Sequence, residues 1–284
     1  MPYLIATVKE RQQGIINVTM GVGKHSNFGH LFIFVLNLGK ISVNKKEVMQ
    51  VFYLPDVNNR DEAWLPPEEA HHCVAVLRLK KGDRLHLVNG LGTLYEACII
   101  ETYKDRCKVR ILSSVASFRK RDYHLHIAVA LPKNIDRFEW FLEKATETGI
   151  DEITPLLCRH AERKTLNEER CRRVLIAAMK QSGKAFLPVL HAPCSFEDFV
   201  KIPREGGRYL AHCQASQDKN MFRFLQKDEQ VTALIGPEGD FSPDEVSLAM
   251  DCGYLPVSLG SSLFRTETAA LTVCMAVYVV NEMK

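Results

Sequence analysis

The sequence carries little net charge and has no cysteine pair at metal-site spacing. Its formal net charge at pH 7 is +3 over 284 residues, which is too small to indicate nucleic-acid binding by itself. Any basic surface must therefore be local. The nine cysteines are scattered, odd in number and free of C-x-x-C pairs, so we expect neither a disulfide framework nor a structural metal site. Such cysteines suit a reducing compartment, which predicts a cytoplasmic protein.

Long apolar runs and the common nucleotide-binding motifs are also missing. The longest apolar candidate, residues 31–38, is far shorter than the roughly 18 residues of a membrane span, so no membrane association is expected. The dinucleotide pattern G-x-G-x-x-G is absent, and so is G-x-x-x-x-G-K-[ST], because residues 21–25 lack its first glycine. The usual dinucleotide-binding and P-loop sites are therefore not expected.

Two glycine-bearing segments near the end of the chain are the most informative feature. Residues 234–242 read LIGPEGDFS, and residues 259–270 read LGSSLFRTETAA. Each segment follows a short apolar run of strand character and precedes a helical pattern. Ser242, Pro243 and Glu245 supply a helix cap, a proline at the first helical position and a capping-box glutamate. Two such loops at the strand ends of an α/β sheet predict a ligand crevice.

The preceding residues indicate two domains of different character. Residues 123–131 and 150–157 are typical of strands, and they alternate with helical patterns at residues 136–148 and 168–181. This alternation predicts an α/β domain with a mostly parallel sheet at residues 122–284. Residues 49–118 instead show short alternating segments and an Asn89-Gly90 turn, which predict a small β-barrel.

The two glycine-bearing segments resemble motifs of the RsmE family of SPOUT methyltransferases. The matching residues are 235–242 and 259–269, and segments 130–133, 143–149 and 180–183 are also similar to the family. The resemblance covers about residues 49–284. It implies a knotted parallel-sheet domain at 122–284 behind a PUA-like RNA-binding domain at 49–118. The implied activity is S-adenosylmethionine-dependent methylation of uridine N3 in 16S rRNA of the small ribosomal subunit, by a homodimer.

Residues 1–48 differ from the remainder of the chain. They carry five glycines and little helical periodicity, and the resemblance begins only at Met49. We therefore expect residues 1–48 to be an extension outside the fold, with Met49 as the biological start.

The resemblance, together with glycine's tolerance of close backbone approach, assigns the ligand-contacting residues. The predicted cofactor-binding residues are Leu234, Ile235, Gly236, Gly239, Leu259, Gly260, Leu263 and Phe264. The predicted RNA-binding residues are Arg78, Lys80, Lys81, Arg84 and Lys133, whose charges suit phosphates. Alternatively, the basic residues of the domain at 49–118, called the front domain below, form an ordinary solvent-exposed face without a role in RNA binding.

Uridine N3 carries a proton that must leave during methylation, and its loss places charge on the flanking carbonyl oxygens. A base or a cation near those oxygens is therefore expected. Arg265, at the start of the last helix, is the candidate cation. Glu267 and Glu238 are the candidate bases, although a glutamate in a first helical turn also stabilises its helix regardless of chemistry. The sequence does not decide between them.

Three departures from the family pattern and two other functions stay open. Asp240 stands where the family has glycine, Ala161 where it often has serine, and Ser262 where it often has a basic residue. One alternative function is a SPOUT methyltransferase that acts on another RNA position. The other is an RNA-binding or ribosome-assembly factor without catalysis, which would have no need of the cofactor.

Overall fold

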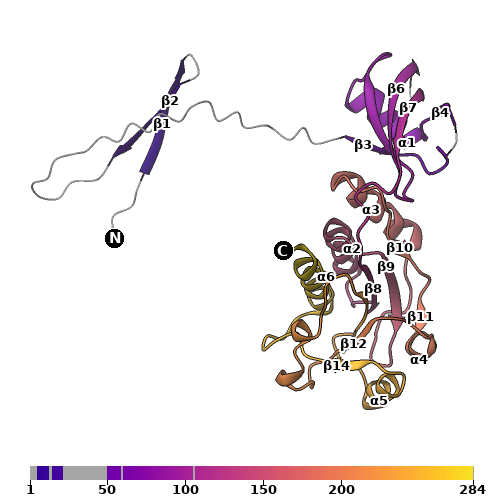
Figure 1. Cartoon of the computed structure of the whole chain (residues 1–284), viewed down its shortest axis with the longest axis vertical. Helices are drawn as coiled ribbons and strands as arrows, with labels where there is room; N and C mark the ends of the chain where they lie inside the picture. The colour runs from indigo at the N-terminus through magenta and orange to yellow at the C-terminus, as the bar shows by residue number, and fades with distance from the viewer. Residues whose placement is uncertain (1–4, 13–14, 22–49, 59, 105, 284) are drawn as a thin grey trace, which may run out of the picture. The chain divides into compact units, whose positions relative to one another are not determined.

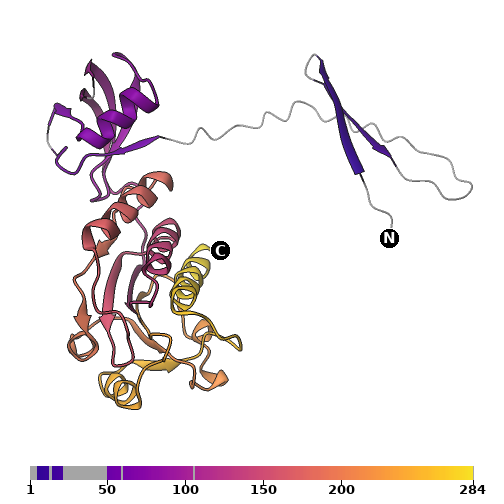
Figure 2. The same ribbon diagram turned by 180° about the vertical axis from the view of Figure 1, so that it is seen from behind.

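The computed structural model describes residues 5–12, 15–21, 50–58, 60–104 and 106–283. The chain divides into two compact units, residues 1–45 and 46–284 (Figures 1 and 2). In the first unit, β1 (Ile5–Gln12) and β2 (Ile15–Gly21) pair as an antiparallel hairpin. The apolar run at residues 31–38 lies outside the described residues.

We predict that residues 1–48 are dispensable for folding and activity. The larger unit contains every core cluster found in the described residues, so a chain that begins at Met49 retains all of that packing. Its unfolding temperature and its activity should match those of the full chain. Aggregation of the shortened protein, or loss of its activity, would show that residues 1–48 are required for folding or activity.

The front domain is built on a five-stranded sheet in the order β3-β5-β6-β7-β4. Its strands are β3 (Val51–Tyr53), β4 (Glu62–Trp64), β5 (Arg84–Val88), β6 (Leu94–Tyr103) and β7 (Arg106–Val115). Side chains of β6 alternate between buried and part-exposed, as a half-buried strand requires. Helix α1 (Pro67–His71) continues into a π-helical turn, η1 (His72–Val76). Among the described residues the end strands β3 and β4 do not pair, so barrel closure stays a prediction.

The second domain contains a seven-stranded sheet in which all the strand pairs are parallel. Its strands are β8 (His124–Ala130), β9 (Glu152–Leu157), β10 (Val189–Leu190), β11 (Cys194–Ser195), β12 (Gly207–Ala211), β13 (Gln230–Ile235) and β14 (Leu255–Val257). The order is β10-β9-β8-β13-β12-β14, with β11 also beside β9. The predicted α/β class with a parallel sheet is confirmed.

Helices cover both faces of this sheet (Figures 1 and 2). One apolar cluster joins alternate residues of β8 to α2 (Ile135–Thr148), α3 (Glu168–Gln181) and α6 (Thr266–Glu282). The other cluster joins the intervening residues of β8 to α4 (Phe196–Lys201) and α5 (Pro243–Asp251). Short 3-10 turns η2 (Gln217–Lys219) and η3 (Met221–Arg223) precede β13. Within the described residues, no helix has the length and apolar character needed to cross a membrane.

Local sequence signals account for several helix ends. Asn134 caps α2 by accepting a hydrogen bond from the Asp136 amide, and Gly149 ends that helix in a left-handed conformation with φ of 116°. The predicted capping box at the start of α5 is present, because Ser242 and Glu245 each accept the other's backbone N–H.

The two domains meet through backbone hydrogen bonds at a glycine-rich turn of the front domain. The Gly92 amide donates to the Ala185 carbonyl at 2.9 Å, and the Leu187 amide donates to the Gly90 carbonyl at 2.9 Å. An ion pair between Lys180 and Glu69 adds a contact with an N–O distance of 2.5 Å. Buried apolar residues from both domains fill the space between them, namely Val51, Val88, Met179 and Ala185.

We expect Gly92→Ala to destabilise this joint. Gly92 has φ of 92°, and a Cβ atom there would overlap the Phe186 ring. Gly82→Ala is the matched control, because Gly82 has φ of 97° and nothing within 4 Å of an added Cβ. Gly92→Ala should cost about 1–3 kcal/mol more than the control, as overpacking does elsewhere. Thermal unfolding of both variants measures the difference, and equal unfolding temperatures would contradict the prediction.

Candidate active site

A pocket of about 520 Å³ lies at the carboxyl ends of β12, β13 and β14. Three consecutive loop segments line it: residues 211–213, residues 235–240 without Gly239, and residues 258–266; Ala269 also contributes. Neighbouring parallel strands direct their following loops to the same edge of a sheet, so loops far apart in sequence meet there. The ligand crevice predicted from the two glycine-bearing segments is present.

Most of the predicted cofactor-binding and catalytic residues reach this pocket. Those that line it are Ile235, Gly236, Glu238, Leu259, Gly260, Leu263, Phe264 and Arg265. Leu234 does not, because its side chain is fully buried in the apolar cluster beneath α4 and α5. Gly239 is also outside the lining, and a Cβ atom there would lie 3.2 Å from His160 Cβ. Neither residue lines the pocket, and cofactor contact at these two positions stays a prediction.

Specific hydrogen bonds hold the three loops together. The Thr266 hydroxyl donates to the Gly236 carbonyl at 3.0 Å, which ties the start of α6 to the loop after β13. Asp240 accepts from the Cys213 amide at 2.9 Å and from the Phe241 amide at 2.9 Å. Asp240 has φ of 59°, a left-handed conformation that favours glycine and that aspartate tolerates better than most residues. The departure from glycine therefore adds a bond between two loops.

Arg265 lies where the pocket meets the amino end of α6. It occupies the position before the first helical residue, and no side chain caps the helix there. Its guanidinium is exposed and forms no ion pair or hydrogen bond with the described residues. The free amides of the helix terminus and this guanidinium together make the region attractive to negative charge.

Glu238 lines the pocket from the loop after β13. Its Oε1 accepts a hydrogen bond from the Lys133 backbone amide at 3.1 Å. The Lys133 ammonium group itself lies 3.0 Å from a carboxylate oxygen of Glu162. Lys133 is therefore beside the pocket, where its charge is shared with an acidic side chain.

The structure does not bring Glu267 into the pocket. Its carboxylate is buried and faces a separate recess of about 370 Å³, lined also by Asp136, Arg137, Trp140 and Thr268. The Arg137 guanidinium approaches Glu267 at 3.9 Å, and the second carboxylate oxygen has no hydrogen-bond partner among the described residues. A role in removing a proton inside the main pocket is not supported by this placement.

Comparison with known proteins places the chain in a family. Residues 119–278, more than half of the chain, match the family described as RNA methyltransferase domain. This protein belongs to the RNA methyltransferase family. Residues 65–112 match the companion family described as RNA methyltransferase PUA domain. Both domains of the second unit are therefore accounted for.

Individual relatives agree with this assignment. The chain is similar to ribosomal RNA small subunit methyltransferase E of Rickettsia conorii, at 31% identity over 71% of this chain and 83% of the relative. A crystal structure of a probable rRNA-methyltransferase from Porphyromonas gingivalis shares 36% identity and a TM-score of 0.76, covering 82% of this chain and 98% of that chain. A Legionella pneumophila structure in complex with the bound cofactor SAM shares 30% identity and a TM-score of 0.74, over the same fractions.

The loop after β12 gives this RNA methyltransferase pocket residues that the sequence patterns did not single out. His212 and Cys213 both line the pocket. Burial lowers the pKa of His212, so its imidazole is neutral and able to accept a proton at neutral pH. Burial and the neighbouring Asp240 raise the pKa of the Cys213 thiol, so this cysteine stays protonated and is a poor nucleophile. The sequence signal for His212 and Cys213 is the strand at residues 207–211, because the residues after a third parallel strand lie at the same edge of the sheet.

The predicted RNA-binding residues of the front domain lie away from the pocket, around the start of β5. Arg78, Lys80, Lys81 and Arg84 are all exposed. Arg84 is partly neutralised by Glu96, with an N–O distance of 2.7 Å. Ion pairs for the other three are absent from the described part of the chain, so their charges remain available to a polyanion.

Two of the departures from the family pattern have clear positions. Ala161 is buried in the cluster beneath α4 and α5, so its side chain packs against the core. Ser262 is exposed and lines the pocket, so the lost basic residue removes charge from the pocket mouth.

Proposed function

We propose that this RNA methyltransferase transfers the methyl group of S-adenosylmethionine to N3 of a uridine in 16S rRNA of the small ribosomal subunit. The observation that carries the proposal is the meeting of the two motif loops in one pocket, with Arg265 at its edge. The Rickettsia conorii relative is named as a small-subunit ribosomal RNA methyltransferase, and the Legionella pneumophila structure holds SAM. Uridine N3 as the target comes from the resemblance of the motifs.

The pocket residues fit the cofactor through their backbone. Gly260 has φ of 116°, and the Ser258 hydroxyl accepts from the Gly260 amide at 3.0 Å, which fixes the loop in an open turn. Gly236, Leu259 and Gly260 line the pocket, so an adenosine bound there would lie against their backbone. When bound, S-adenosylmethionine supplies an electrophilic methyl group on a positively charged sulfur. The knotted arrangement expected of SPOUT proteins is part of the proposal and rests on the resemblance of the motifs.

The remaining chemistry is removal of the N3 proton and neutralisation of the resulting charge. We assign Arg265 to stabilise the developing negative charge, because it is a permanently charged group at the amino end of a helix. His212 and Glu238 are the proton acceptors that line the pocket. Placement of the acceptor, the donor and the methyl group in line supplies most of the catalysis in a displacement of this kind.

Mass mapping of small-subunit RNA tests this function. RNA from a deletion strain should lack one methyl group at a uridine, and a plasmid copy of the gene should restore it. A pure RNA-binding factor would leave the RNA mass unchanged and would not bind labelled S-adenosylmethionine. Methylation at another nucleotide would support the transferase activity and reject the assigned position.

We predict that Lys80→Ala combined with Lys81→Ala weakens RNA binding without affecting the cofactor. Both ammonium groups are exposed on the front domain, where they can neutralise phosphates. Affinity for small-subunit RNA should fall mainly at low salt, and the salt dependence should flatten by about two phosphate contacts. Lys227→Ala, an exposed lysine between η3 and β13, serves as the control. Identical salt slopes for the double variant and the wild type would remove these lysines from the RNA surface.

A homodimer in the cytoplasm is the proposed working form. Helices α2 and α6 carry exposed large apolar side chains, among them Trp140, Met275 and Val279. The buried Glu267 oxygen without a donor lies beside Trp140, at the same two helices. A partner surface that supplied a donor there and covered the apolar residues would satisfy both features. Light scattering at low micromolar concentration measures the state, and an active monomer would contradict it.

A further inference from the structure

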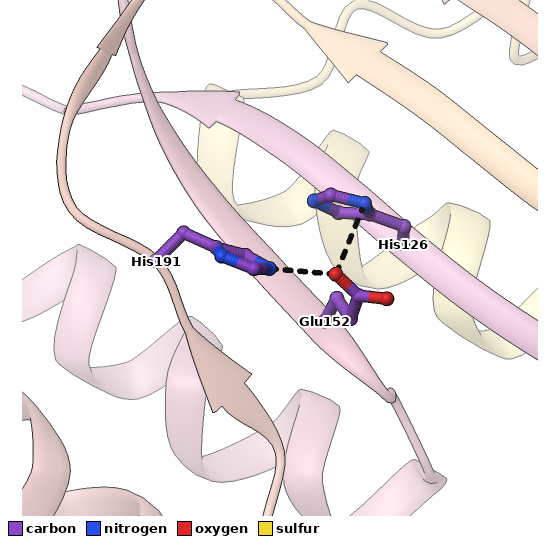
Figure 3. Close-up of side chains that lie close together, drawn as sticks. All are labelled: His126, Glu152 and His191. Atoms are coloured by element: carbon purple, nitrogen blue, oxygen red, sulfur yellow. Dashed lines mark hydrogen bonds and ion pairs between the residues drawn. The ribbon is translucent and has the colours of Figure 1, made fainter. Parts of the chain in front are cut away.

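A cluster of two histidines and a glutamate lies at the opposite end of the parallel sheet from the pocket. His126 is in β8, Glu152 begins β9, and His191 follows β10. His126 and Glu152 are direct neighbours in the strand register, so their side chains emerge side by side on one face. Figure 3 shows the Glu152 carboxylate between the two imidazole rings. Three elements of the sheet therefore converge on one point.

The donor atoms of this cluster are close to a metal-binding arrangement. His191 Nε2 lies 2.6 Å from Glu152 Oε2, and His126 Nδ1 lies 3.6 Å from the same oxygen (Figure 3). All three donor atoms lie within 4.8 Å of one another. In a tetrahedral zinc site the ligand atoms are about 3.3 Å apart. Side-chain rotations that move the donor atoms by roughly an ångström would therefore produce this arrangement.

We propose that His126, Glu152 and His191 bind one divalent transition-metal ion, with Zn²⁺ as the best-suited ion. Two imidazoles and one carboxylate are a ligand set typical of zinc and unlike the all-oxygen sets of magnesium and calcium. The surrounding contacts suit such a site. His126 Nε2 is 2.8 Å from the Thr154 hydroxyl, which fixes the ring and leaves Nδ1 toward the carboxylate.

Access and orientation also favour binding. The His126 side chain is buried, whereas that of His191 is 41% exposed, so an ion can enter from solvent and meet a fixed inner ligand. His124 Nε2 lies 3.0 Å from the other Glu152 oxygen, Oε1, and holds the carboxylate in place. A bound ion would connect β8, β9 and the segment that follows β10.

Arg204 is the competing group at this site. Its Nη1 lies 3.1 Å from His126 Nδ1, the atom that the ion would use. The Arg204 Nε atom is buried and has no hydrogen-bond partner among the described residues. Displacement of Arg204 Nη1 from His126 Nδ1 would free the ligand atom for the ion.

Titration of the chelator-treated full chain with Zn²⁺ and Co²⁺ tests the proposal. One ion should bind per chain, Co²⁺ should give the intense visible absorption of a tetrahedral site, and Mg²⁺ should not compete. His191→Gln should weaken Zn²⁺ affinity by about a hundredfold or more. Mutation of residues that only hydrogen-bond to metal ligands already lowers metal affinity about 10–100-fold. His71→Gln is the control, because His71 is an exposed histidine outside the cluster.

Arg204→Gln separates this site from adventitious surface binding. Removal of the competing cation should tighten Zn²⁺ binding about tenfold, while cofactor affinity stays unchanged because the pocket is at the other sheet end. Saturating Zn²⁺ should also raise the unfolding temperature of the wild type and not that of His191→Gln. Failure of the wild type to bind one equivalent, or equal affinity in wild type and His191→Gln, would overturn the proposal.

Discussion

Arg265→Ala should lower turnover by about a hundredfold or more, the effect of removing one preorganised charge-stabilising group. Arg265 lines the pocket at the amino end of α6, and its guanidinium has no recorded ion-pair partner among the described residues. Cofactor affinity should change little, because the proposed adenosine contacts are backbone groups. Arg265→Lys should recover part of the rate, since lysine keeps the charge and loses the planar fork.

The controls for Arg265 distinguish catalysis from binding. Arg173→Ala removes an exposed arginine of α3, which does not line the pocket, and should leave turnover unchanged. Higher pH should restore part of the rate of Arg265→Ala, because hydroxide then removes the N3 proton without assistance. If Arg265→Ala instead lost cofactor affinity and kept normal turnover at saturating cofactor, the role of the arginine would be to bind the carboxylate of the cofactor's methionine moiety.

Gly260→Val should reduce cofactor affinity by about tenfold to a hundredfold. Gly260 has φ of 116°, so a β-branched residue there must either carry strain of about 1–3 kcal/mol or shift the loop. The loop forms a wall of the pocket, and a shift would displace the backbone groups assigned to the adenosine. Calorimetric titration with S-adenosylmethionine measures the loss directly.

Gly82→Val is the matched control for this loop. Gly82 has φ of 97° and open space around an added Cβ, as Gly260 does, but lies in the front domain. The two variants should suffer comparable strain, so only Gly260→Val should lose cofactor affinity. Equal affinities in both variants would show that the backbone of this loop does not contact the cofactor.

The helices and the two motif loops could be predicted from local sequence because their signals are local. The helix predicted at residues 168–181 is α3, and that predicted at residues 136–148 differs from α2 by one residue at its start. Caps and apolar periodicity act within one or two turns, so the sequence states them directly. The pocket itself followed from two loops that each carry a recognisable glycine pattern.

Features that depend on packing between distant segments could not be read in the same way. Glu267 follows Arg265 by two positions, yet helical rotation directs it into a separate recess with Arg137. Leu234 precedes Ile235 in β13, and strand alternation places its side chain in the core. His212 reaches the pocket only because β12 lies beside β13 in the sheet.

The histidine–glutamate cluster shows the same limit for metal ligands. Glu152 and His191 are 39 positions apart, a separation far from the short spacings that identify zinc sites in sequences. Their proximity results from the parallel pairing of β9 with β10. Only the sheet register brings them together, so the sequence predicted no metal site.

The joint between the front domain and the methyltransferase domain fixes the distance between the basic residues of the first and the pocket of the second. Gly90, Gly92 and Lys180 fasten the domains by hydrogen bonds and an ion pair, so the basic residues before β5 are held at a set span from the pocket. An RNA must then offer a phosphate track and a reachable base at that same span. If the proposed function holds, recognition depends more on the three-dimensional spacing of the RNA phosphates and the target base than on the sequence around that base.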